Sequence, residues 1–119
     1  MGNSILVVDD QPGIRMLLSE VLSDKGYAVS LAGTGKDAID KLSEKLYDLV
    51  ILDYKLPVLD GKEVIKQMNS DKNHTKIVVM SGMAESIQEE LADYKVEKLI
   101  SKPFNLNELC ADVEDILDD

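Results

Sequence analysis

Four short, strongly apolar runs in this chain each end at a polar or charged residue. The runs cover residues 5–8, 49–52, 77–80 and 99–101, and the residues that follow them are Asp9, Asp53, Ser81 and Lys102. Runs rich in β-branched residues and apolar on both faces are typical of buried strands in a parallel sheet. In an open parallel sheet the ligand crevice lies outside the carboxyl ends of the strands. The sequence therefore predicts an α/β fold that gathers these polar side chains at one edge of one sheet.

Amphipathic helical patterns separate the predicted strands. Apolar residues recur at helical spacing in segments 12–25, 34–46, 61–69, 84–94 and 106–117, and residues 27–32 alternate as a further strand. The pattern is (βα)5, which requires right-handed crossovers and a sheet covered on both faces. Segment 84–94 carries the fewest apolar side chains, so we expect it to be the least firmly anchored helix.

Charge and composition exclude several classes of protein. The chain has 119 residues and a formal net charge of -10, from 13 Lys+Arg against 23 Asp+Glu, which argues against a nucleic-acid-binding surface. No apolar run approaches the ~20 residues of a membrane span, and the signal-peptide pattern is absent. The single Cys110 fits a reducing compartment. We therefore expect one cytoplasmic domain over residues 1–119, monomeric and without nucleic-acid or membrane partners.

The carboxylates at the strand ends need a counterion. Asp10 adjoins Asp9, and Asp53 joins them at the predicted edge. Two charges ~4 Å apart interact by roughly 4 kcal/mol at an effective dielectric of 20, so crowded carboxylates share protons or bind a cation. An all-oxygen donor set suits a hard cation such as Mg²⁺. Because Mg²⁺ often binds one or two carboxylates together with phosphate oxygens, the sequence predicts a phosphoryl group as the substrate.

Lys102 and Ser81 complete a predicted phosphoryl-transfer site. Lys102 supplies a positive charge for a phosphate oxygen, and Ser81 supplies a short hydroxyl donor. A carboxylate can attack phosphorus and form an aspartyl phosphate, while a metal and a lysine neutralise the equatorial oxygens. Asp53 stands alone after its apolar run, whereas Asp9 and Asp10 form a pair. We therefore assign Asp53 as the nucleophile and phosphoacceptor.

Taken together, the motifs resemble those of response-regulator receiver domains of two-component signalling, over essentially the whole chain. The matching segments are VVDD at 7–10, DLVILD at 48–53, LP at 56–57 with DG at 60–61, MSG at 80–82 and KPF at 102–104. The resemblance implies a flavodoxin-like, doubly wound (βα)5 fold with a five-stranded parallel sheet in the order 2-1-3-4-5. It also implies a chain that catalyses its own Mg²⁺-dependent phosphorylation and slow dephosphorylation, without being a dedicated metabolic enzyme.

The resemblance also implies a role for each residue of the site. Asp53 accepts phosphoryl from a phosphohistidine of a sensor histidine kinase. Asp9 and Asp10 hold Mg²⁺, with Asp53 and the backbone carbonyl of Lys55 completing the protein ligands. Lys102 contacts the phosphoryl group, and its peptide bond to the following proline is cis. Ser81 is the switch hydroxyl that moves to bind phosphate.

Residues 9–15, DDQPGIR, most resemble the single-domain phosphorelay intermediates of sporulating bacteria. Such proteins take phosphoryl from sensor histidine kinases and pass it to a histidine phosphotransferase whose helical bundle docks around their first helix. The resemblance implies a docking edge made of Gln11, Gly13, Ile14, Arg15 and Leu18. Of these, Ile14 and Leu18 are expected to divide between the core and the docking surface.

Three departures from the family pattern bear on function. Leu99 stands where many receivers carry Tyr or Phe, Ser81 replaces the commoner Thr, and residues 94–96 replace the usual Gly-Ala. The absence of the aromatic residue mildly favours a relay. Two alternatives stay open: the receiver of a longer DNA-binding regulator, and a pseudo-receiver that binds partners without phosphorylation. The acidic segment 114–119, which looks like a helix end, disfavours the first, and the intact acidic set disfavours the second.

Overall fold

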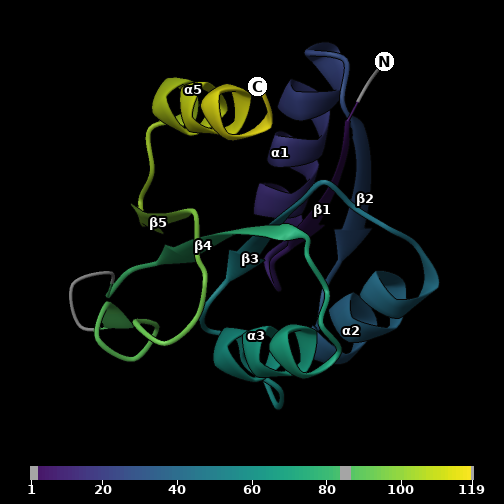
Figure 1. Ribbon diagram of the computed structural model, residues 1–119. Coiled ribbons are helices and arrows are strands. Elements are labelled where there is room, and N and C mark those ends of the chain that lie inside the picture. The colour runs from purple at the N-terminus through teal and green to yellow at the C-terminus, as the bar shows by residue number, and fades with distance from the viewer. Residues whose placement is uncertain (1–2, 84–86, 119) are drawn as a thin grey trace.

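The structure is a computed structural model that describes residues 3–83 and 87–118. Five parallel strands form one sheet in the order β2-β1-β3-β4-β5, which confirms the predicted fold and strand order. The strands are β1 (Ser4–Val8), β2 (Ala28–Ala32), β3 (Leu49–Asp53), β4 (Lys76–Ser81) and β5 (Lys98–Ser101). The helices are α1 (Pro12–Asp24), α2 (Gly35–Glu44), α3 (Gly61–Ser70) and α5 (Leu106–Leu117). Figure 1 shows α1 and α5 on one side of the sheet and α2 and α3 on the other.

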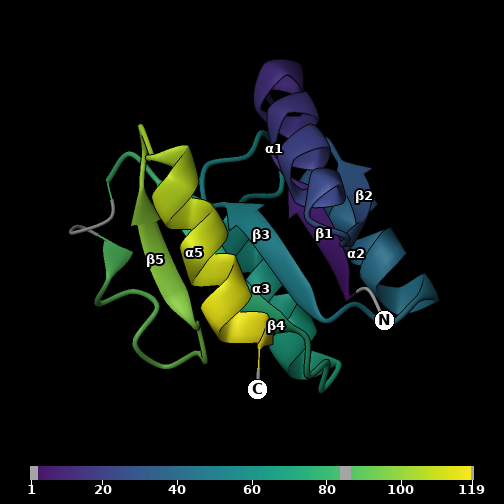
Figure 2. The same cartoon turned by 90° about the horizontal axis from the view of Figure 1, so that it is seen from above.

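The core consists of two apolar layers separated by the sheet, and α1 and α5 cover one of them (Figure 2). Successive strand residues point to opposite faces. In β1, Ile5 and Val7 belong to the layer under α1 and α5, whereas Leu6 and Val8 belong to the layer under α2 and α3. Strands β1, β3 and β4 are buried over nearly their whole length. This burial on both faces explains why their sequences lack a polar face.

Side-chain caps set the start of three helices. The side chains of Thr34, Asp60 and Asn105 each accept a hydrogen bond from the backbone N–H three residues later, at 3.0, 3.1 and 3.1 Å. Each cap satisfies a donor that the helix itself leaves unpaired and contributes about 1 kcal/mol.

The helix predicted for residues 84–94 is not a regular helix in its described part. Residues 84–86 lie outside the described residues, and residues 88–93 form turns. Local hydrogen bonds hold these turns, such as the one from Leu91 N–H to the Ile87 carbonyl at 3.1 Å. Ile87 and Leu91 are the buried anchors of this stretch. Because helices in proteins depend mainly on packing of an apolar face, so few anchors favour turns over a full helix.

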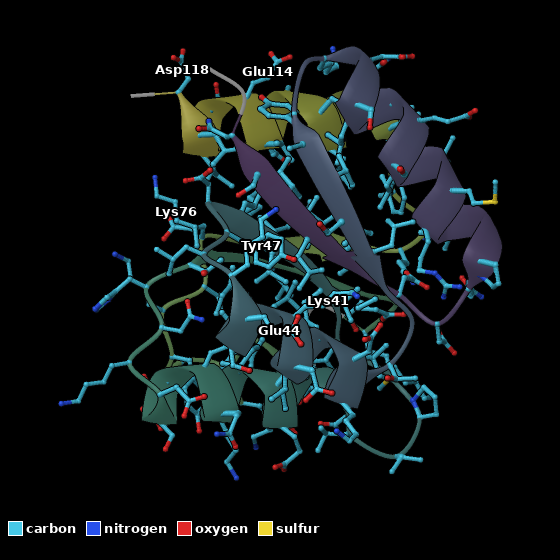
Figure 3. All side chains as sticks on the ribbon, turned by 90° about the vertical axis from the view of Figure 1, so that its right-hand side faces the viewer. Lys41, Glu44, Tyr47, Lys76, Glu114 and Asp118 are labelled. Carbon is cyan, nitrogen blue, oxygen red and sulfur yellow. The ribbon has the colours of Figure 1, made fainter. Side chains whose placement is uncertain are left out.

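Lys76, the first residue of β4, ties the sheet to the end of α5. Lys76 Nζ donates to the carbonyl of Ile116 at 2.9 Å. Figure 3 labels Lys76 together with Glu114 and Asp118 at this end of α5. A cation beside the last carbonyls of a helix interacts favourably with their partial negative charge. Within the described part of the chain, no helix is long and apolar enough to cross a membrane.

Candidate active site

Three carboxylates meet at the carboxyl edge of the sheet. Asp9 and Asp10 follow β1, and Asp53 is the last residue of β3. Strands β1 and β3 are neighbours, with Val8 opposite Leu52, so the residues that follow them come side by side. One carboxylate oxygen from each of the three residues lies within 4.8 Å of the others. The structure thus brings together the three carboxylates expected to bind a metal.

Lys102 bridges two of these carboxylates. Its Nζ lies 2.9 Å from Asp9 Oδ2 and 3.0 Å from Asp53 Oδ2. Burial lowers the pKa of Lys102, but its hydrogen bonds to Asp9 and Asp53 outweigh this effect and leave the pKa above its ordinary value. The ammonium therefore stays charged at neutral pH and serves as a counterion. The peptide bond between Lys102 and Pro103 is cis, as the family resemblance implied.

Asp53 is almost completely buried, with 5% of its surface exposed. Burial raises the pKa of Asp53, and the negative charge of Asp9 raises it further. The hydrogen bonds from Lys102 and from the N–H of Lys55, the latter at 3.2 Å, lower the pKa without cancelling the rise. A carboxylate whose ionised form is incompletely compensated favours the binding of a further cation.

The donor set fits Mg²⁺. Asp9 has no exposed surface, and its Oδ1 accepts the N–H of Gln11 at 2.9 Å. Asp10 is exposed, so this side of the cluster is open to water. Mg²⁺ prefers oxygen ligands and usually keeps several of its waters. A cluster of carboxylates, partly buried and partly open to solvent, meets both requirements.

Ser81 lies at the same edge of the sheet. It ends β4, whose Met80 is opposite Asp53, so Ser81 is one residue beyond that pair. Its side chain is buried, and its Oγ accepts the N–H of Met83 at 2.9 Å. Its backbone carbonyl accepts the N–H of Lys102 at 2.8 Å, which joins the ends of β4 and β5. The hydroxyl is thus held by its own loop, close to the strand that carries Asp53.

Comparison with known proteins settles the family. Residues 5–114 match the family described as "Response regulator receiver domain". The chain is a response-regulator receiver domain. It is 36% identical over 110 residues to "Sporulation initiation phosphotransferase F" of Bacillus subtilis, covering 92% of this chain and 89% of that protein. It is 38% identical over 115 residues to "Response regulator MprA" of Mycolicibacterium vanbaalenii, covering 95% of this chain but 49% of that relative, or about half its length.

Solved structures of response regulators superpose over nearly the whole receiver. One is response regulator TrrA of Thermotoga maritima in complex with Mg(2+)-BeF, with a TM-score of 0.86, 36% identity, and 97% and 99% of the two chains covered. Another is chemotaxis response regulator CheY4 of Vibrio cholerae, with a TM-score of 0.88, 29% identity, and 98% and 100% covered. The fold of this receiver is therefore that of two-component response regulators.

The residues of the predicted docking edge differ in exposure. Gln11 and Gly13 are exposed, and Ile14 is half-buried at the start of α1. Of the two residues expected to divide between the core and the docking surface, Leu18 is the core residue, because it has no exposed surface and packs in the layer between α1 and the sheet. Leu18 lies one turn after Ile14 on the stripe that faces the sheet, so a docking partner has no access to it.

Arg15, the fifth predicted docking residue, contacts the main chain beside the site. Its Nη1 donates to the backbone carbonyl of Asp9 at 2.7 Å. A Cβ atom at Gly33, in the loop after β2, would lie 2.9 Å from the same Nη1. Sequence reasoning missed both contacts, because an arginine that binds a backbone carbonyl leaves no motif.

Tyr54 links the site to the turns at residues 88–93, which the sequence did not suggest. Its hydroxyl donates to the carboxylate of Glu90. Its backbone N–H donates to the carbonyl of Met80 at 2.9 Å, so the main chain of Tyr54 remains hydrogen-bonded to β4. Burial and the hydrogen bond to Glu90 raise the pKa of Tyr54. The residue next to Asp53 is therefore neutral and tied to a weakly anchored segment.

Proposed function

We propose that this receiver accepts a phosphoryl group on Asp53 from a histidine kinase and relays it to a histidine phosphotransferase. The observation that carries the proposal is the buried carboxylate of Asp53, with Lys102 Nζ at 3.0 Å and two further carboxylates beside it. Likeness to a sporulation phosphotransferase over 92% of this chain supports the relay role. We further propose that residues 1–119 form one receiver domain that acts as a cytoplasmic monomer.

The proposed metal site consists of Asp9, Asp10, Asp53 and the backbone carbonyl of Lys55. The structure with Mg(2+)-BeF bound to TrrA supports Mg²⁺ as the ion. The bound ion would supply positive charge to the oxygens of the transferred phosphoryl group. The acidic cluster of this chain has the oxygen donors that such an ion needs.

The chain's own residues would carry the rest of the transfer. A carboxylate oxygen of Asp53 attacks phosphorus in line, the P–N bond to the partner's imidazole breaks, and its electron pair stays on the imidazole nitrogen. Lys102 turns from the two carboxylates toward a phosphoryl oxygen and compensates its charge. Ser81 donates its hydroxyl to another oxygen. In onward transfer a histidine nitrogen attacks the same phosphorus, and the bond to Asp53 breaks.

Small-molecule phosphorylation tests the role of Asp53. With Mg²⁺ and acetyl phosphate, we expect the wild type to gain one base-labile phosphoryl group, seen by intact-protein mass spectrometry. Asp53→Asn should gain none, whereas Asp40→Asn, on the exposed side of α2, should behave as the wild type. Phosphorylation of Asp53→Asn at the wild-type rate would show that the phosphoacceptor is another residue.

Phosphotransfer profiling separates the relay from the alternatives. Labelled histidine kinases are mixed with the receiver, the labelled receiver is mixed with a histidine phosphotransferase, and each transfer is followed over time. Rapid transfer in both directions supports the relay. One-way loading supports the receiver of a longer output regulator, an alternative favoured by the MprA relatives that this chain covers by about half. If beryllofluoride causes no Mg²⁺-dependent change in the protein, that result supports a pseudo-receiver.

A further inference from the structure

Every polar atom of Asp9 has a partner within the chain. Its N–H donates to the carbonyl of Ala32 at 3.2 Å, and Oδ1 accepts the N–H of Gln11 at 2.9 Å. Its Oδ2 accepts Lys102 Nζ at 2.9 Å, and its carbonyl accepts Arg15 Nη1 at 2.7 Å. Asp9 itself has no exposed surface, so these groups of the chain supply its hydrogen bonds in the folded protein. Arg15 is the only side chain among the described residues that holds the Asp9 backbone.

We propose that Arg15 is a positioning residue that fixes the backbone of Asp9, and through it the carboxylate offered to the metal. This inference rests on the proposed Mg²⁺ site. Asp9 comes directly after the last residue of β1, where the chain leaves the sheet. A buried carbonyl at such a point needs a donor, since an unpaired buried acceptor is unfavourable. The guanidinium of Arg15 supplies that donor from the first turn of α1.

Gly33 leaves the space in which Arg15 lies. A Cβ atom on Gly33 would be 2.9 Å from Nη1 and 3.3 Å from Cζ of Arg15, closer than side chains pack. Any other residue at this position would force the guanidinium of Arg15 to shift. Arg15 therefore lies against the loop after β2 while it binds the main chain at the end of β1.

Two roles for Arg15 make opposite predictions. Partners that orient a metal ligand typically change metal affinity by about 10–100-fold when they are removed. A positioning role therefore predicts weaker Mg²⁺ binding in Arg15 variants, with no partner protein present. A pure docking role predicts unchanged Mg²⁺ binding and slower transfer to the phosphotransferase.

Magnesium titrations of the full chain provide the first test. Binding is followed by the amide shift of Lys55, whose N–H donates to Asp53. We expect Arg15→Met to bind Mg²⁺ about tenfold more weakly or worse, and Gly33→Ala to be weakened in the same direction. Lys36→Met, which removes an exposed cation of similar length from α2, should bind as the wild type. Unchanged affinity in folded Arg15→Met would overturn the proposal.

The carbonyl carbon resonance of Asp9, measured with chelator, provides a readout without metal. We expect this resonance to move in Arg15→Met and in Gly33→Ala but not in Lys36→Met, because the first two variants disturb its hydrogen bond. Gly33→Ala keeps the test open if Arg15→Met does not fold. If the wild type fails to bind Mg²⁺, the proposed metal site is refuted, and the Asp9 resonance then decides the role of Arg15 by itself. An unmoved resonance in both variants would overturn that role.

Discussion

Asp53 is less stable as a carboxylate in the folded chain than in the unfolded one. Its burial raises its pKa above the value of 3.8 for an exposed aspartate. Since the folded-state pKa is the higher one, folding favours the protonated form. The resulting loss of stability is present at neutral pH and disappears as the pH falls through the folded pKa and below 3.8. The carboxylate therefore costs stability under the conditions in which it reacts.

Asp53→Asn should accordingly raise the free energy of unfolding at pH 7 in the presence of chelator. The amide oxygen can still accept from Lys55 and Lys102, but the ionised group is gone. Urea unfolding from pH 7 to pH 3 should show this gain shrinking toward zero at the acidic end. With Asp40→Asn as the control, a lower unfolding midpoint for Asp53→Asn at pH 7 would contradict the assigned pKa direction.

The side chains of the site follow from sequence where their position depends on strand ends alone. Asp9, Asp53 and Ser81 come directly after or at the end of buried runs, and parallel strands must end at one edge. The contact of Arg15 with a backbone carbonyl has no such signature. Helical spacing identified the apolar stripe of α1, but it did not say which of Ile14 and Leu18 the sheet covers completely.

Helix α1 offers a direct comparison of a buried and an exposed apolar residue. Leu18 has no exposed surface, whereas Met16 is 64% exposed. Leu18→Ala should lower the free energy of unfolding by about 2–5 kcal/mol, through lost burial and the cavity left behind. Met16→Ala should change it by less than about 0.5 kcal/mol. Urea denaturation of both variants checks this, and equal effects would contradict the burial of Leu18.

The turns at residues 88–93 should be the first part of the described chain to open. Their amides should exchange with deuterium faster than those of β4, because Ile87 and Leu91 are the only buried side chains of residues 87–93. Tyr54→Phe removes the hydrogen bond to Glu90 and should speed this exchange further. Tyr27→Phe, in the loop before β2, is the matched control. If Tyr54→Phe leaves the exchange rates in the turns unchanged, the hydrogen bond between Tyr54 and Glu90 does not hold them.

Strands were predicted more accurately than this segment for a physical reason. A strand buried on both faces shows a continuous apolar run, as 49–52 does, and the run itself gives its limits. A helix requires an apolar stripe over several turns, and segment 84–94 has only a sparse one. A weak periodicity of this kind does not distinguish a helix from a series of turns.

Metal binding should stabilise the folded receiver as a unit. A ligand that binds only the native state at 100 times its dissociation constant adds about 2.7 kcal/mol to the free energy of unfolding. In urea unfolding experiments at constant ionic strength, we expect an increase of this size when Mg²⁺ is added at 100 times its dissociation constant. The increase should be much smaller in Asp10→Asn, because that variant lacks an exposed carboxylate of the cluster. Equal increases in both proteins would argue for binding elsewhere.

The arrangement of the strands is less accessible from sequence than their existence. Periodicity identifies strands and helices, but the order β2-β1-β3-β4-β5 depends on which edges pair across the sheet. That order came from the resemblance to receiver domains, which the structure then confirmed. Once the order is known, the meeting of Asp9 with Asp53 follows from the pairing of β1 with β3.

The alternation of strand residues between the two apolar layers governs which mutations the gene can tolerate. Exchanging Val7 for another aliphatic residue keeps every neighbour on its own face. Deleting Val7 would shift the strand by one residue, exchange its two faces, and turn Asp9 away from its partners. In a library of variants, the central strands should therefore accept many conservative substitutions and almost no single-codon insertions or deletions.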